Sequence, residues 1–257
     1  MFKKTKRVII ISGVLYVWAV KSFNPSPKEL LSPSWHKGVP LRIAARGLTR
    51  LLPDLYQRFG ERGVRALQFV FYQIGRDRAP ILREALEIDP HDARSLGRVL
   101  DYEDGVVGVK GIWVEETKGR AVKEERFCPA EEELSCCPEV CTCLFMAMEA
   151  GTYSALNPDV EVPELSDLLS LGDQCCLATI ELSGISRREA RKPSPQATPG
   201  AFPPRITVPG LQQRLALQSL RSIVYAIGTL LTKGPDQPMQ WYEFFRYNPE
   251  SSLLHPR

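Results

Sequence analysis

All seven cysteines of this chain lie between residues 126 and 182, and the remainder of its 257 residues contains none. They are Cys128, Cys136, Cys137, Cys141, Cys143, Cys175 and Cys176. Cysteine side chains act as metal ligands, as nucleophiles or as small buried hydrophobic groups. The clustering therefore indicates that this stretch is either a functional site or the core of one compact module.

The spacing of these cysteines differs from that of structural zinc sites. Such sites bring thiolates to one ion, usually as CxxC pairs. This chain offers one CxC pair and two adjacent cysteine pairs instead. Adjacent residues of a strand point to opposite faces of the sheet, so they cannot easily share one ion. We therefore expect no metal and no cofactor, and metal binding stays open as an alternative.

A reactive thiol is the second interpretation. Cys136 and Cys137 precede a predicted helix start at Pro138, where unpaired N–H groups stabilise a thiolate. The acidic run at 131–133 acts in the opposite direction, because nearby negative charge disfavours ionisation. None of the three histidines of the chain lies in the cysteine stretch. The residues alone leave both a reactive site and simple burial of the thiols open.

The segments around this stretch predict an α+β fold. Apolar residues such as Val64, Leu67 and Phe71 recur at helical spacing within 41–86 and predict a core-facing helix that ends near Gly75. After residue 104 the pattern alternates around Trp113, and a turn at 117–119 predicts a β-hairpin. A helix over 138–156 and a strand over 176–181 follow. We expect N-terminal helices, then an antiparallel β-hairpin, a helix and a further strand in one small sheet.

The chain divides into four parts. Residues 1–40 form a basic and apolar N-terminal segment with a connector, and residues 41–183 form the α+β domain. Residues 184–210 are rich in proline, which predicts an unstructured linker. Residues 211–257 contain a predicted helix, interrupted by arginines, and an aromatic tail, both expected to dock.

Charge is distributed unevenly along the chain. Residues 1–80 carry 15 Lys and Arg against 4 Asp and Glu, whereas residues 81–180 carry 8 against 21. We interpret the basic third as solvated helix faces that complement the acidic middle. The chain has no RNA-binding signature, zinc-finger spacing or aromatic-interleaved basic motif, so we expect no nucleic-acid partner.

The cysteine pattern and the N-terminal residues indicate where in the cell the protein is located. An odd number of cysteines with two adjacent pairs favours reduced thiols and a cytoplasmic protein. The apolar run at 8–20 follows four basic residues. It is shorter than the roughly 20 residues that a membrane span needs. A signal-like segment, a buried strand and membrane association through 8–20 remain alternatives for this run.

Short motifs in the cysteine stretch carry a resemblance to a known family. In chain order they are Phe127-Cys128-Pro129, Pro138-Glu139-Val140-Cys141, Leu156-Asn157-Pro158, and Leu171-Gly172-Asp173 followed by Cys176. Their order resembles that of the L-2-amino-thiazoline-4-carboxylic acid hydrolase family, over about residues 41–182. A more distant similarity is to 4-vinyl-reductase-type small-molecule-binding domains.

The resemblance implies an α+β hydrolase that opens the ring of a small cyclic amidine acid. Its motif positions correspond to Cys128, Cys141, Asp173 and Cys176, with one thiol as nucleophile and Asp173 as base or orienting group. Arg126 is the expected partner of the substrate carboxylate. The alternative is a non-catalytic module that binds a small molecule or a metal and docks a partner through its C-terminal tail.

Overall fold

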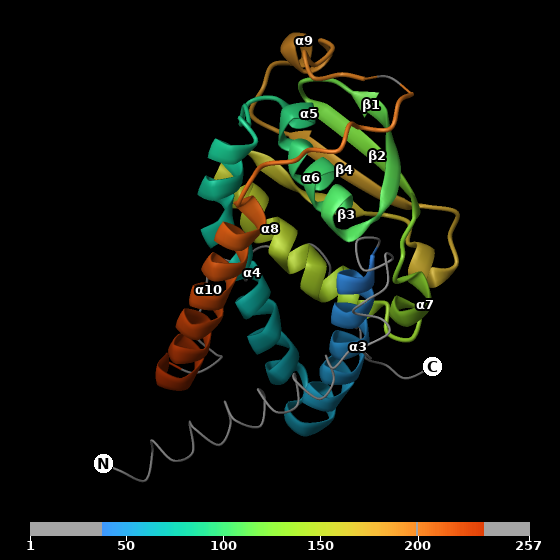
Figure 1. The fold of residues 1–257 in the computed structure, drawn as a ribbon. Coiled ribbons are helices and arrows are strands. Elements are labelled where there is room, and N and C mark those ends of the chain that lie inside the picture. The colour runs from blue at the N-terminus through green and yellow to red at the C-terminus, as the bar shows by residue number, and fades with distance from the viewer. Residues whose placement is uncertain (1–37, 199, 234–257) are drawn as a thin grey trace.

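The computed structural model describes residues 38–198 and 200–233, and shows an α+β fold as the sequence predicts (Figure 1). The predictions for residues 8–20 and for the aromatic tail near residue 241 lie outside this part of the chain. None of the helices in the described ranges has the length and apolar character that crossing a lipid bilayer requires.

A four-stranded antiparallel sheet forms one layer of the fold, in the order β1-β2-β4-β3. Its strands are β1 (Lys110–Glu116), β2 (Arg120–Phe127), β3 (Val160–Leu165) and β4 (Cys176–Leu182). The predicted hairpin is confirmed as β1 and β2, and the predicted later strand as β4. The segment 160–165, for which the sequence predicts only a short extended stretch, pairs with β4 as an edge strand.

One face of the sheet is covered by helices (Figure 1). These are α5 (Ala93–Leu96), α6 (Arg98–Val107) and α8 (Met146–Leu156), behind which lies α4 (Glu61–Ala85). Trp113, Tyr153 and Ile180 are almost completely buried in the core between the two layers. The opposite face leaves Val114 about half exposed. Side chains alternate along a strand, so every second residue of β2 faces the helices.

Helices α4 and α8 approach each other through glycine. A Cβ atom on Gly75 would lie 2.0 Å from the carbonyl oxygen of Met148, and one on Gly151 would lie 2.1 Å from that of Tyr72. The predicted helix end at Gly75 is therefore wrong, because α4 continues to Ala85. Gly75 permits a close helix crossing instead of ending the helix, since any larger side chain would separate the two backbones.

The cysteine stretch folds into the region between the sheet and α3 (Val39–Phe59). It contains α7 (Glu131–Leu134), the π-helical turn η2 (Val140–Phe145), which continues into α8, and the short helix η3 (Leu169–Leu171). The predicted helix stop is confirmed, since Asn157 ends α8 in an extended conformation. Most of the cysteines thereby join a second apolar cluster. Single π-helical turns inside longer helices are frequent at functional sites.

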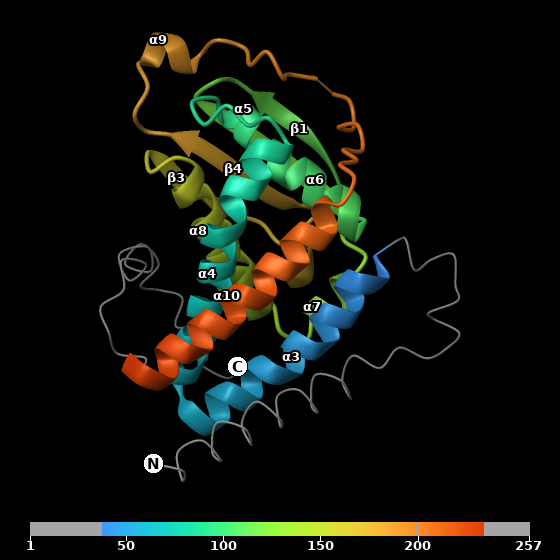
Figure 2. The ribbon, with the colours of Figure 1, turned by 60° about the vertical axis from the view of Figure 1, so that its left-hand side comes forward.

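The proline-rich segment is held against the body of the protein. After α9 (Arg187–Ala190) it runs along the β1 side of the sheet and past α6 to α10 (Leu211–Lys233) (Figure 2). Pro193 forms a bridge with Thr117, and the hydroxyl of Ser194 donates to the carboxylate of Asp92 at 2.9 Å. Helix α10 packs along α4. The prediction of an unstructured linker is therefore wrong for the described residues of this segment, because their polar groups find buried partners.

Candidate functional site

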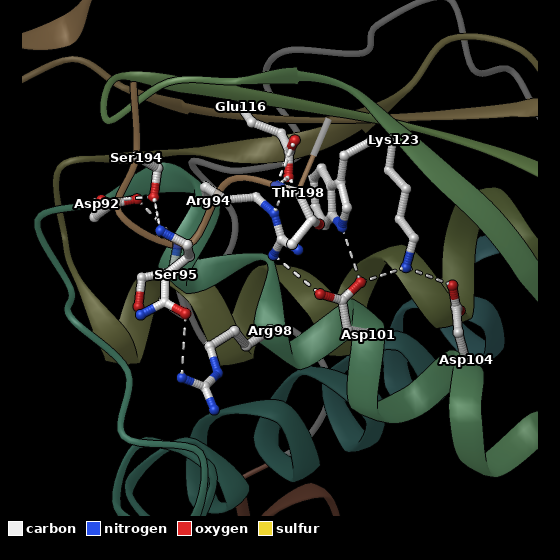
Figure 3. A network of polar contacts seen from close by, with 12 residues as sticks. Asp92, Arg94, Ser95, Arg98, Asp101, Asp104, Glu116, Lys123, Ser194 and Thr198 are labelled. Carbon is white, nitrogen blue, oxygen red and sulfur yellow. Dashed lines mark hydrogen bonds and ion pairs between the residues drawn. The ribbon is translucent and has the colours of Figure 1, made fainter. Parts of the chain in front are cut away.

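A network of buried charges lies between α6 and the sheet (Figure 3). The carboxylate of Asp101 accepts hydrogen bonds from Trp113 Nε1 and Lys123 Nζ, each at 2.9 Å, and pairs with Arg94 at 2.9 Å. Lys123 also donates to Asp104 at 2.7 Å. The side chain of Lys123 is fully buried and that of Asp101 is 3% exposed. Charges buried this deeply are stable only when they are paired and hydrogen-bonded.

Lys123 remains charged in this environment. Burial alone would lower the pKa of its ammonium group, but the carboxylates of Asp104 and Asp101 raise it above the ordinary value. The same burial raises the pKa of Asp104 to about 6, although Lys123 acts in the opposite direction. Lys123, Asp101 and Asp104 therefore form a buried ion cluster, whose charges change the pKa values of nearby acidic groups.

The network also holds the proline-rich segment in place. Arg94 donates to Glu116 at 2.8 Å, and the backbone N–H of Thr198 donates to the same carboxylate at 2.9 Å (Figure 3). The guanidinium of Arg94 stacks over the ring of Trp113, 4.4 Å from its centroid. Such cation–π contacts stabilise a desolvated arginine. Arg94 thus joins α5, the sheet and the segment that leads to α10.

A second buried ion cluster lies on the α4 side of α6. Arg78 pairs with Glu103 and with Glu149, the latter at 2.8 Å, and donates to the hydroxyl of Thr152 at 2.8 Å. Burial, together with the nearby carboxylate of Glu149, raises the pKa of Glu103 to about 8, against the effect of Arg78. The two buried carboxyl groups beside one arginine repel each other, and this repulsion favours the protonated form of Glu103.

Glu125 differs from the acidic groups of these two clusters because no described residue forms a hydrogen bond or an ion pair with it. It lies two residues after Lys123 on β2 and faces the helices, partly buried. Its neighbour on β1 is Gly111, which has no side chain to cover it. Burial and the charge of Asp104 raise the pKa of Glu125 to about 8, while Lys123 acts to lower it.

Three of the four predicted catalytic residues lie in the neighbourhood of Glu125. Cys176 is its direct partner on β4, Cys128 follows the end of β2, and Cys141 lies in the π-helical turn. The charge of Glu125 contributes to the raised pKa of each of these thiols. The structure thus gathers thiols that are up to 48 positions apart in the sequence.

All three thiols are neutral at physiological pH. Burial is the main cause, and it raises the pKa to about 11 for Cys128 and to about 12 for Cys141 and Cys176. The N–H of Leu169 donates to the sulfur of Cys176 at 3.4 Å. The backbone N–H of Ala130 acts to lower the pKa of Cys128 and so favours its thiolate, but burial outweighs this effect. A thiol of this kind attacks a substrate only if a base removes its proton.

The other two predicted site residues lie elsewhere. Asp173 is exposed, and its carboxylate accepts the backbone N–H of Leu168 at 2.9 Å, which stabilises the loop before β4. Arg126 follows Glu125 on β2 and therefore points to the opposite face of the sheet. There it pairs with Glu124 at 2.5 Å. Neither residue is placed beside the three thiols.

The site residues predicted from the sequence did not include Glu125, Asp104 or Lys123. One signal was present, because Lys123 and Glu125 occupy alternate positions of a predicted strand whose neighbouring inward residue is Ala121. Charges at the inward positions of a strand indicate a buried polar site. Within residues 38–198 and 200–233, no three His, Cys, Asp or Glu side chains are grouped as metal ligands.

The fold and the cluster define a small α+β protein with a partly buried carboxyl group beside neutral thiols. Neither a scan against protein-family models nor a search of the curated proteins finds a match to the chain.

Proposed function

We propose that this protein is a hydrolase that opens the ring of a small cyclic amidine acid, with Glu125 as its acid–base group. The observation that carries the proposal is the state of Glu125: partly exposed, without a partner among the described residues, and with a pKa of about 8. General acid–base catalysis is most efficient when the pKa of the catalytic group lies near the working pH. The motif resemblance to the thiazoline hydrolases supplies the substrate class.

Cys128 is the thiol best suited to act as nucleophile. Its pKa is the lowest of the three thiols whose pKa Glu125 raises, and its side chain is partly exposed, whereas Cys141 is buried. In the first step Glu125 takes the proton of the Cys128 thiol as the sulfur bonds to the amidine carbon. The ring bond between that carbon and its heteroatom breaks, and Glu125 returns the proton to the leaving heteroatom.

Water completes the reaction in the second step. Glu125 takes a proton from water as the water oxygen bonds to the same carbon. The bond from carbon to sulfur then breaks, and the proton returns to Cys128. The net change is the addition of one water molecule across the opened ring bond, so no oxidant, reductant or cofactor is consumed. Lys123 acts as a positioning residue, because its charge moderates the pKa of Glu125.

The test is turnover of 2-amino-thiazoline-4-carboxylate by the purified full chain, followed by chromatography. We expect Glu125→Gln to lower kcat/KM by a factor of about 10²–10⁴, the usual contribution of an acid–base group. Cys128→Ser should abolish turnover, while Cys136→Ser, which changes an exposed thiol, should leave it intact. Full activity of Glu125→Gln, or no turnover of any cyclic amidine acid by the wild-type protein, would refute the proposal.

A non-catalytic binding module is the second candidate. It is favoured by the raised pKa values of the thiols, because neutral thiols pack as small hydrophobic groups. Helix α10 also exposes an apolar stripe, with Leu217, Leu220 and Val224 each more than half exposed. This candidate predicts substrate-analogue binding that survives Cys128→Ser, without turnover by the wild-type protein.

A further inference from the structure

A hollow of about 360 Å³ lies on the side of α6 that faces away from the sheet. Its walls come from α6, from the end of the proline-rich segment and from the first turn of α10, which meet there in Figure 2. The residues that bear on its chemistry are Tyr102, Gly105, Arg205, Thr207, Gln212 and Gln213. The hollow is separate from the carboxyl–thiol cluster, since Glu125 and the three thiols take no part in its walls.

Tyr102 lines this hollow, and its buried hydroxyl has no hydrogen-bond partner among the described residues. The residue is only 4% exposed. A buried hydroxyl without a partner costs free energy, so such groups are rare unless a ligand or water satisfies them. Burial, with a smaller contribution from Glu103, raises the pKa of Tyr102, so the hydroxyl remains a hydrogen-bond donor at neutral pH.

Arg205 supplies a positive charge to the same wall. Its side chain lies near Gly105, where a Cβ atom would be 3.6 Å from its Cγ. No described residue forms an ion pair or a hydrogen bond with its guanidinium. An arginine that lines a concave site without a protein carboxylate is suited to binding a carboxylate or a phosphate group.

The start of α10 adds backbone donors. The N–H of Leu211 donates to Val208 and that of Arg214 to Gly210, whereas the N–H groups of Gln212 and Gln213 have no backbone acceptor within the described part of the chain. Both glutamines line the hollow. Helix N-termini attract anions through such free N–H groups and through the helix dipole. The residues that line the hollow thus carry three kinds of donor, and none of them is acidic.

We infer that this hollow is a binding site for a small organic anion, a carboxylate or a phosphate monoester, held by Arg205, the Tyr102 hydroxyl and the first turn of α10. The aliphatic side chains of Val106, Ile206 and Val208 form the rest of the wall and suit a short apolar body. A ligand there bridges α6, the proline-rich segment and α10, so its binding would stabilise the attachment of α10.

Calorimetric titration of the full chain tests this inference. The probes are inorganic phosphate, glycerol 3-phosphate and succinate at constant ionic strength, with glycerol as the uncharged control. Binding of glycerol 3-phosphate alone would identify a phosphate monoester as the ligand class, and binding of succinate alone would identify a carboxylate. Failure of all three probes to bind at millimolar concentration would overturn the inference.

Three variants separate a built site from unspecific attraction. Arg205→Gln should weaken binding about tenfold or more, because it removes the charge-assisted hydrogen bonds. Tyr102→Phe should weaken binding about threefold or more without lowering the unfolding temperature, because the hydroxyl has no partner within the fold to lose. Arg191→Gln removes an exposed charge outside the hollow and should leave the affinity unchanged. Equal affinities in all three variants would also overturn the inference.

Anion binding in the hollow does not depend on the proposed hydrolase activity. The titration measures heat of binding and needs no turnover, and Glu125 lies outside the hollow. Glu125→Gln should therefore bind the anion with the wild-type affinity. A protein that binds the anion but turns over no cyclic amidine would retain this site and lose only the proposed reaction.

Discussion

Replacing Glu125 by glutamine should stabilise the protein at alkaline pH. In the unfolded chain this carboxyl ionises near its ordinary pKa of 4.5, whereas in the folded protein the pKa is raised to about 8. Between these pH values the folded state binds the extra proton, so the free energy of unfolding falls as pH rises. Below pH 4.5 both states are protonated, and above pH 8 the loss is complete.

The magnitude follows from the size of this shift. Each pH unit of difference corresponds to about 1.4 kcal/mol, which gives a loss of roughly 4–5 kcal/mol between the two pKa values. Asp104 and Glu103 repel the same negative charge, so part of this loss belongs to the cluster as a whole. We therefore expect Glu125→Gln to raise the free energy of unfolding at pH 8.5 by about 2–4 kcal/mol.

Urea unfolding of both proteins at pH 4.5, 7 and 8.5, followed by tryptophan fluorescence, measures this effect. The gain should be absent at pH 4.5 and grow with pH. Glu124→Gln is the matched control on the opposite face of β2, where the carboxylate pairs with the exposed Arg126. Exposed ion pairs contribute about 1 kcal/mol or less, so this control should change stability little. If Glu125→Gln left the pH dependence of the free energy of unfolding unchanged, the pKa of Glu125 would not be raised in the folded protein, and the reasoning would be refuted.

Asp101→Asn should destabilise the fold by about 3 kcal/mol, because it removes the shared carboxylate of the buried Arg94 and Lys123; thermal unfolding measures the loss. Gly75→Ala should cost about 3 kcal/mol in the same experiment, since its Cβ would press on the backbone of α8. In the native protein at pH 7.5, the exposed Cys136 should react first with a thiol reagent, and the buried thiols only after unfolding; mass spectrometry of peptides from a time course would show any other order.

The cysteine positions themselves were only partly informative about the site. Their clustering, and the predicted hairpin, helix and strand, were enough to predict that Cys128, Cys141 and Cys176 belong to one region. The same clustering wrongly placed Asp173 and Arg126 beside the three thiols. Proximity along the chain does not reveal on which face of a strand a side chain lies, nor that a carboxylate is already engaged by the backbone of its own loop.

Local properties of the chain determined the class of fold. Helical and alternating apolar periodicities depend on neighbouring residues alone, so they predicted the α+β architecture, the hairpin and the end of α8 at Asn157. Gly75 shows the limit of this reasoning, because the same residue type ends helices and permits close crossings. Only the position of α8 decided between the two.

Tertiary structure alone decided the chemistry of the site. The pKa of a carboxyl or thiol group depends on how deeply it is buried and on which charges surround it, and these neighbours come from distant parts of the chain. Glu125 is an ordinary acidic residue in the sequence. It becomes a candidate acid–base group because α6 places Asp104 near it, β4 places Cys176 opposite it, and Gly111 leaves its flank on β1 uncovered.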